Sequence, residues 1–208
     1  NYLGLTNHFI QEGLAYRFTP FELPENARGN VLVDTDKMYD NLMHKFKFGG
    51  IDKPGIYLDE NILRMCFSHR RLFTQLAAQL ITEGKKEQAL AVLDYAERMI
   101  PAYNVPYDAQ NGADSMAESY YQLGETAKAD AIIKALADNK VEYITWYLSL
   151  NDYHFTLSAS QLMRYHLGWL DEFVKIMTNH QSAQAALYTS KSNELYGLCV
   201  ERLKRLNP

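Results

Sequence analysis

The stretch RRLFTQLAAQLITEGKKEQALAVLDYAERMIP, which runs from residue 70 to residue 101, decides the fold class of this 208-residue chain. Apolar residues recur every three to four positions on either side of Gly84, and Pro101 closes the unit. The apolar positions before the glycine are Phe73, Leu76, Ala77 and Leu80, and those after it are Ala89, Leu93 and Ala96. This period is typical of one face of a helix, so the stretch predicts two helices that fold back on each other across a glycine turn.

These positions fit the 34-residue tetratricopeptide pattern, which has a bulky residue, Leu beside a small residue, a turn glycine, two alanines seven residues apart and a proline. The spacing has a physical cause. Antiparallel helices approach closely only where small side chains lie at their crossing, and Ala77, Ala89 and Ala96 supply them. Gly84 supplies the tight turn, because glycine adopts a left-handed backbone without strain.

The pattern returns with an offset of 40 residues. The second set of positions is Met116, Ala117, Tyr120, Gly124, Ala129, Ile133 and Leu136, where Leu136 departs from the first set by replacing an alanine. The connection AYNVPYDAQNG, residues 102–112, lengthens the spacing beyond 34. The sequence therefore predicts two successive tetratricopeptide-like hairpins within a helical repeat domain that we expect to span residues 59–208.

The rest of the repeat domain carries weaker patterns. Residues 158–177, SASQLMRYHLGWLDEFVKIM, can be divided into helix, Gly168 and helix, but they lack the paired alanines. We interpret them as a degenerate repeat or a capping hairpin. Residues 140–153, rich in Tyr and Trp, predict one helix, and residues 183–206 predict a final helix that covers the end of the stack.

The first 58 residues differ from the rest. Two short apolar runs, GLAYRF at 13–18 and VLV at 31–33, predict strands or extended segments, and ENARGN at 25–30 predicts a turn. Residues 35–47 predict a helix, since Asp34 or Thr35 can cap it and Gly49 with Gly50 can stop it. We therefore expect a mostly α fold: a tetratricopeptide-like α–α superhelix, with residues 1–58 as a short mixed N-terminal segment packed on the repeats.

Composition narrows the function. The net charge is −4 and no basic cluster is present, which argues against nucleic acid as a partner. No run of 18 apolar residues exists, so the fragment is not expected to insert into a membrane. The chain begins at Asn1, within an apparently structured region and without a signal peptide, so we expect it to be a piece of a longer protein.

Motifs for chemistry are missing from the sequence. Cys66 and Cys199 have no CxxC partner, so we expect buried thiols, with a disulfide between them left open. The six histidines form neither HxxxH nor HExxH, and the acidic run at 34–41 lacks the glycine and distal Glu of a calcium loop. With no GxSxG and no glycine-rich phosphate loop, we predict no catalytic residue, no metal ligand and no cofactor.

Binding residues can be suggested only from the expected concave face of the stack. The candidates are Asn61, Arg64, Tyr120 and Tyr121. Asn61 and Arg64 open a predicted helix, where a surface ion pair of Arg64 with Glu60 is the simpler explanation. Tyr120 and Tyr121 belong to a group of aromatic residues that either fill hairpin interfaces or bind peptides or sugars. That group comprises Tyr103, Tyr107, Tyr120, Tyr121, Tyr143, Trp146, Tyr147 and Tyr153.

Several stretches occur in an order that resembles a known family. They are EGLAYRFTPF at 12–21, VDTDKMYDNLMHKFKFGG at 33–50, YLDENILRM with its continuation at 57–94, VPYDAQNG with its continuation at 105–138, and EYITWYLSL at 142–150. This order resembles the C-terminal soluble region of the DUF2723 proteins, a bacterial membrane-protein family common in Bacteroidetes. The resemblance covers most of residues 9–150 and fades afterwards.

The DUF2723 family is similar to the eukaryotic transmembrane protein O-mannosyltransferases. The resemblance implies a multi-spanning, lipid-sugar-dependent glycosyltransferase of the GT-C kind, with this domain on the periplasmic face of the inner membrane. The catalytic acid of such an enzyme lies in the membrane part, upstream of residue 1, so no catalytic residue is transferred to this chain. The expected partners are a protein or peptide ligand and the chain's own upstream membrane domain.

Two other functions stay open at this point. One is a stand-alone tetratricopeptide-type adaptor between proteins, and the other is a small soluble enzyme whose site the sequence does not reveal. The upstream coding sequence separates the adaptor from the glycosyltransferase hypothesis. Many hydrophobic spans there would support the glycosyltransferase, whereas a signal peptide alone would support the adaptor.

Overall fold

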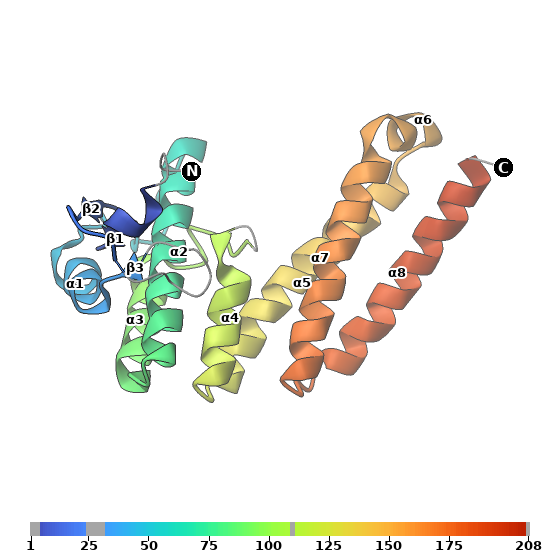
Figure 1. Ribbon diagram of the computed structural model, residues 1–208. Coiled ribbons are helices and arrows are strands. Elements are labelled where there is room, and N and C mark those ends of the chain that lie inside the picture. Colours follow the sequence, from blue (N-terminus) through green and yellow to red (C-terminus); the bar gives the residue numbers. More distant parts are fainter. Residues whose placement is uncertain (1–4, 24–31, 109–110, 207–208) are drawn as a thin grey trace. The chain divides into compact units, whose positions relative to one another are not determined.

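The computed structural model describes residues 5–23, 32–108 and 111–206. Within these ranges α-helices dominate and a small sheet lies near the N-terminus, which confirms a mostly α fold with a short mixed N-terminal segment (Figure 1). The contacts divide the chain into two compact units, residues 1–106 and 107–208.

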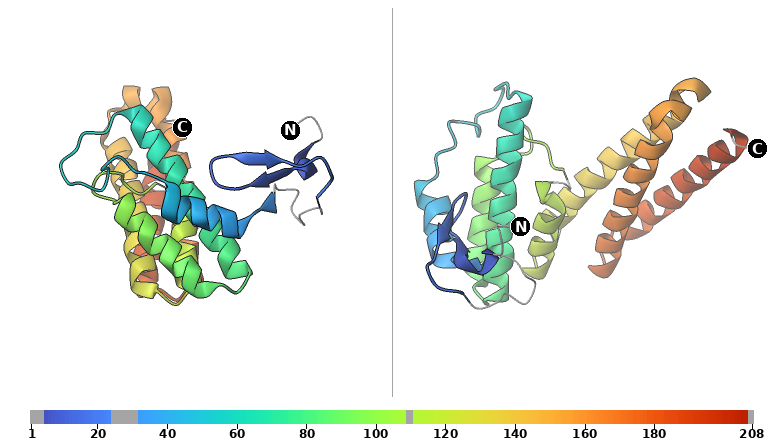
Figure 2. Two further views of the ribbon diagram at one scale, coloured as in Figure 1. Left: turned by 90° about the vertical axis from the view of Figure 1, so that its left-hand side faces the viewer. Right: turned by 45° about the horizontal axis from the view of Figure 1, so that its top comes forward.

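The sheet contains three short strands: β1 (Phe9–Gln11), β2 (Tyr16–Phe18) and β3 (Leu32–Val33). The strand order is β2-β1-β3, with β1 antiparallel to β2 and parallel to β3. Figure 2 shows β1 and β2 as a hairpin. Of the strands predicted at 13–18 and 31–33, Tyr16–Phe18 and Leu32–Val33 are confirmed, whereas residues 13–15 form the bend between β1 and β2. The predicted turn at 25–30 lies outside the described residues.

Helix α1 (Thr35–Asp40) follows β3 and continues as a π-helical turn, Asn41–Lys45. The Asp34 carboxylate caps it by accepting a hydrogen bond from the Lys37 amide at 3.1 Å. The predicted helix at 35–47 is confirmed, and it ends at Lys45. The segment packs on the following helix through contacts such as the 3.0 Å hydrogen bond that Thr35 donates to Glu83.

The first hairpin pairs α2 (Glu60–Thr82) with α3 (Lys86–Met99). Gly84 makes the turn with φ +77°, in the left-handed region that glycine tolerates. Every position that the repeat pattern marks in this hairpin is fully buried or nearly so: Phe73, Leu76, Ala77, Leu80, Ala89, Leu93 and Ala96. The helices and the turn predicted for residues 70–101 are therefore confirmed.

Arg70 holds the connection that leaves this hairpin. Only 1% of this residue is exposed, and its guanidinium donates hydrogen bonds to the carbonyl oxygens of Ile100 (3.0 Å), Val105 (2.6 Å) and Pro106 (2.9 Å). Buried backbone acceptors need a donor, and a buried guanidinium needs several acceptors. Arg70 thus supplies the hydrogen-bond donors for the backbone carbonyls at the end of α3 and in the loop after it.

The second hairpin pairs α4 (Ala113–Gln122) with α5 (Thr126–Ser149) across Gly124, whose φ is +83°. Its marked positions are buried like those of the first hairpin: Met116, Ala117, Tyr120, Ala129, Ile133 and Leu136. The offset of 40 residues in the sequence therefore corresponds to two hairpins with equivalent buried positions.

Residues 140–149 are helical, as predicted, but they are the last part of α5 and not a separate helix. α5 runs without a break to Ser149, because no glycine or proline interrupts residues 126–149 and the buried face continues through Ile144 and Tyr147. A short turn of helix, α6 (Asp152–His154), and a π-helical turn follow.

The predicted break at Gly168 is wrong. α7 (Ser160–Asn179) runs straight through this glycine, and α8 (Ala185–Leu206) confirms the predicted final helix. One glycine inside a helix costs about 1 kcal/mol, less than the burial of a single large apolar side chain such as Phe173 on the inner face of the same helix. α7 packs on α5, and α8 packs on both. The hairpin of this region is α7–α8, whose turn contains Gln181 at φ +54°.

Among the described residues, no helix is both long enough and apolar enough to cross a bilayer. Cys66 and Cys199 are both buried free thiols, as expected. The Cys199 sulfur lies 3.0 Å from the Met163 sulfur, at the contact between α8 and α7, and burial raises the pKa of Cys199 to about 11.

Candidate functional site

Two of the four predicted contact residues lie at the start of α2. Asn61 and Arg64 are both exposed there, and the Arg64 guanidinium donates to Glu60 at 2.5 Å. The pair Glu60–Arg64 is thus the surface ion pair that the i,i+4 spacing predicts. Both candidates are available to a partner, and both belong to the unit 1–106.

The other two predicted residues, Tyr120 and Tyr121, belong to the unit 107–208 and are buried. Tyr120 has no exposed surface, and the Lys128 ammonium lies 5.3 Å from its ring centre. The Tyr121 ring stacks on His180, with the ring centres 4.3 Å apart. The four candidates therefore do not come together in one unit, and the two tyrosines stabilise helix packing.

Asp130 gathers polar groups around Tyr121. It accepts hydrogen bonds of 2.6 Å from the Tyr121 hydroxyl and from the Ser182 hydroxyl in the turn before α8. Burial, with Asp130 adding to it, raises the pKa of Tyr121 above its ordinary value, so the phenol stays protonated. This cluster links α4, α5 and the α7–α8 turn.

A second buried polar group consists of Lys140 on α5 and His166 on α7, which are 4% and 8% exposed. Burial lowers the pKa of both, and the Lys140 charge lowers that of His166 further. The His166 ring stacks on Tyr143 at 4.6 Å between ring centres, and its Nδ1 has no hydrogen-bond partner among the described residues. Both side chains lie inside the contact of α5 with α7, and neither lines the grooves described next.

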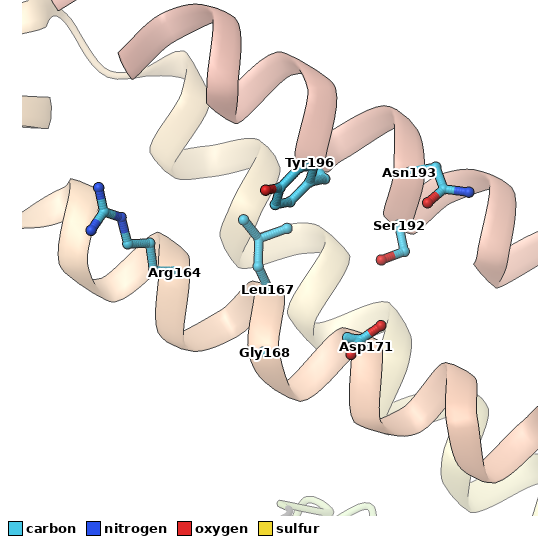
Figure 3. A pocket seen from close by; sticks show the side chains of 7 residues that line it. All are labelled: Arg164, Leu167, Gly168, Asp171, Ser192, Asn193 and Tyr196. Carbon is cyan, nitrogen blue, oxygen red and sulfur yellow. The ribbon is translucent and has the colours of Figure 1, made fainter. Parts of the chain in front are cut away.

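A groove of about 460 Å³ lies between α7 and α8. Its lining residues are Arg164, Leu167, Gly168 and Asp171 from α7, and Ser192, Asn193 and Tyr196 from α8. Figure 3 shows Leu167 and Tyr196 facing each other in the middle, with Arg164 toward one end and Asp171 toward the other. Both helices therefore contribute polar and apolar groups to one depression.

Most polar side chains of this α7–α8 groove make no hydrogen bond or ion pair with the described part of the protein. Among the described residues, no side-chain hydrogen bond or ion pair is recorded for Arg164, Ser192, Asn193 or Tyr196, and 62% of Tyr196 is exposed. Asp171 is the exception, since it pairs with Lys175 at 2.8 Å. The groove thus presents donors and acceptors that only water or a ligand can satisfy.

A second depression, of about 410 Å³, lies along α7 and shares Arg164 and Gly168 with the first. Its other lining residues are Tyr165, Trp169 and Glu172. Gly168 is the common floor, and a Cβ placed on it would have no atom of another residue within 4 Å. The two depressions therefore meet at a helix position where the backbone itself is open to solvent.

Sequence reasoning missed this site because it interpreted Gly168 as a helix break. The signal was present as spacing: Arg164, Gly168 and Asp171 recur at i, i+4 and i+7, and Ser192 and Tyr196 recur at i and i+4. Such spacing places residues on one helix face. Which two faces meet is a property of the hairpin, and the hairpin was assigned to the wrong residues.

The two depressions offer a ligand aromatic faces and hydrogen-bonding groups. Their lining residues include neither His nor Cys, and their charged groups are Arg164, Asp171 and Glu172. Across the described residues, no group of three or more His, Cys, Asp or Glu side chains is arranged to hold a metal ion. Comparisons of the chain with protein-family models, curated proteins and solved structures found no match.

Proposed function

We propose that this chain is the non-catalytic C-terminal domain of a multi-spanning membrane glycosyltransferase-like protein, where it acts as a protein-binding or bracing scaffold. In this proposal the hairpins stack as a tetratricopeptide-like right-handed superhelix on the periplasmic face of the inner membrane. The parent protein would transfer a lipid-linked sugar to protein, with its catalytic acid outside this chain.

The observation that supports the scaffold most directly is the equivalence of two hairpins. α2–α3 and α4–α5 bury corresponding small residues, Ala77 with Ala89 and Ala117 with Ala129, and both turn at a left-handed glycine. Repeats of this kind bury a continuous core by stacking and expose an extended surface to partners. The membrane context is supported by the order of motifs across residues 12–150, which resembles the DUF2723 family.

The exposed candidate contacts for a protein partner are Asn61 and Arg64 on α2, together with the exposed aromatic residues Tyr143 and Trp146 on α5. Tyr and Trp side chains give large contact areas with a polar group at one edge, which protein-binding surfaces use often. A bracing role would use the same surfaces against the upstream membrane domain.

The first experiment is to determine the coding sequence upstream of residue 1. Many hydrophobic spans support the membrane glycosyltransferase. A signal peptide alone would contradict it and would favour the stand-alone adaptor.

The second experiment uses the full-length protein in membranes and measures glycosyl transfer to its acceptor protein. Replacing Asn61 and Arg64 together by Ala should lower transfer by roughly fivefold, the effect of losing about 1 kcal/mol of acceptor binding. The matched control replaces Lys86 and Gln88, an exposed cation and amide on α3, by Ala and should leave transfer unchanged. Equal transfer by both variants would refute acceptor docking on this face of α2.

A further inference from the structure

We propose that the two depressions that meet at Gly168 form one binding site for a short neutral oligosaccharide, laid across α7 between the side chains of Tyr196 and Trp169. The inference concerns α7 and α8 alone, so it goes beyond the proposed function and stands or falls without it.

The first argument is the glycine. Gly168 has no positive φ and lies in the middle of a 20-residue helix, so its backbone does not require glycine. No neighbouring atom would obstruct a Cβ there, so the packing does not require it either. Glycine in a helix interior is less stable than alanine. Unlike Gly197, Gly168 lines both depressions, so its missing side chain leaves the helix backbone open to close approach by a ligand there.

The second argument is the placing of aromatic rings on both sides of this glycine. Tyr196 from α8 lies over one depression, and Tyr165 and Trp169 from α7 line the other. Tyr196 is mostly exposed and Tyr165 is 42% exposed, so part of each side chain is open to solvent. The C–H face of a pyranose packs on such rings, because it is flat and apolar while its hydroxyls point outward.

The third argument is the set of hydrogen-bonding groups around the rings. Arg164 and Asn193 offer donors, Asn193, Asp171 and Glu172 offer acceptors, and the Ser192 hydroxyl does both. Sugar hydroxyls also donate and accept, so this mixed set matches them.

Charge and apolar content exclude the main competing ligands. Asp171 and Glu172 offset Arg164 and the neighbouring Lys175, which pairs with both carboxylates, so the site has no excess of positive charge for a nucleotide or another polyanion. Leu167 is the one aliphatic side chain that lines either depression, so an amphipathic helix would find little to bury. The two volumes, about 460 and 410 Å³, each fall in the range of ligand sites, and together they fit a chain of sugars better than a single one.

The test uses Trp169 as a reporter. The chain has two tryptophans, so Trp146→Phe leaves Trp169 as the sole source of indole fluorescence. We would titrate this variant with four neutral trisaccharides, maltotriose, cellotriose, mannotriose and N,N′,N″-triacetylchitotriose, and would follow backbone amide shifts of the 208-residue chain by NMR. The expected result is saturable binding of at least one trisaccharide, with shifts at residues 164–172 and 192–196.

Paired variants separate the site from general effects on the fold. Tyr196→Ala and Gly168→Ala should each weaken binding by about tenfold, because the first removes an aromatic face and the second fills the floor. Gly197→Ala is the matched control, since Gly197 is also an exposed mid-helix glycine whose Cβ would have no atom of another residue within 4 Å. It should leave binding unchanged.

Several outcomes would overturn the proposal. One is that none of the four trisaccharides binds at its highest soluble concentration, and another is that Gly168→Ala and Gly197→Ala bind equally well. Binding of an unglycosylated peptide at the same amides, with no competition from the trisaccharides, would assign the groove to a peptide. None of these outcomes bears on acceptor docking at Asn61 and Arg64, so failure here and failure of the proposed function remain distinguishable.

Discussion

The hairpins α2–α3 and α4–α5 differ from the hairpin α7–α8 in where their small residues lie. In the first two, alanines lie in the buried interior and a left-handed glycine makes each turn. In α7–α8, the turn passes through Gln181, and the small residues Gly168 and Ser192 line an outward-facing groove. The interior of that hairpin is filled by large side chains such as Leu170 and Phe173.

The difference teaches that a small residue has opposite effects on the two sides of a helix pair. On the inner side it lets the backbones approach, which closes the interface and leaves no room for a ligand. On the outer side it leaves a hollow that no neighbouring side chain fills. The first two hairpins are therefore built for packing, and the third combines packing with a surface for recognition.

The largest effect should come from removing the guanidinium that closes the first hairpin. Arg70→Met leaves three carbonyl acceptors of the α3 end and its loop without their donor, so we expect the free energy of unfolding to fall by about 3–5 kcal/mol. Urea denaturation measures the loss. Arg71→Met is the control, because Arg71 is exposed on the same helix and should change stability by less than about 0.5 kcal/mol. Similar losses in both variants would show that Arg70 is not the anchor of this connection.

The equivalence of the first two hairpins can be tested by overpacking. Ala89→Leu and Ala129→Leu add three carbon atoms to fully buried positions and should each cost about 1–3 kcal/mol in thermal or urea unfolding. Ala91→Leu and Ala131→Leu, two residues further along the same helices and again 40 apart, are exposed controls that should cost little. If only one of the two buried variants were destabilised, the hairpins would not be equivalent.

The contact of α8 with α5 should show a dependence on alkaline pH. Burial, and the hydrogen bond of 2.5 Å to Asp138, raise the pKa of Tyr188 to about 12, above its unfolded value near 10. The phenol is therefore held neutral in the folded state, so its contribution to stability is complete below pH 10 and is lost as the pH rises from about 10 to 12. After allowance for solvent screening we expect a loss of about 1–2 kcal/mol.

Variants at two tyrosines of α8 measure this contribution. Tyr188→Phe should be less stable than the parent at neutral pH, and the gap should narrow between pH 10 and pH 12 in urea unfolding experiments. Tyr196→Phe, an exposed tyrosine of the same helix, should follow the parent at every pH. A constant gap for Tyr188→Phe would refute the shifted pKa.

The smallest effect concerns the stability of the α7–α8 hairpin. Gly168→Ala and Gly197→Ala should each raise the free energy of unfolding by about 0.5–1 kcal/mol, because alanine loses less backbone entropy in a helix and neither Cβ meets an obstacle. Thermal unfolding of the two variants checks this. A loss of stability in Gly168→Ala would mean that the glycine serves packing, which would also remove the first argument for a ligand at this position.

Sequence alone determined the local features whose signal is periodic or stereochemical. The alternation of large and small apolar residues at 70–101 fixed the first hairpin, since helical spacing, a glycine turn and buried alanines all follow from neighbours along the chain. The offset of 40 fixed the second hairpin in the same way. Asp34 was predictable as a helix cap because its carboxylate accepts a hydrogen bond from a backbone amide that lies three residues later in the chain.

Tertiary structure decided what depends on partners distant in the chain. The sequence pattern gives no sign that Arg70 is buried, because the carbonyls that it binds lie 30 to 36 positions later in the sequence. From the sequence, Tyr120 and Tyr121 could fill a hairpin interface or contact a ligand, and the helices around them bury both. Gly168 was interpreted as a helix break, but the burial of other α7 side chains outweighs the cost of a glycine in the helix. The packing of α8 beside α7 then places Gly168 in the lining of a groove. Propensity acts over a few residues, whereas burial is set by whichever faces finally meet.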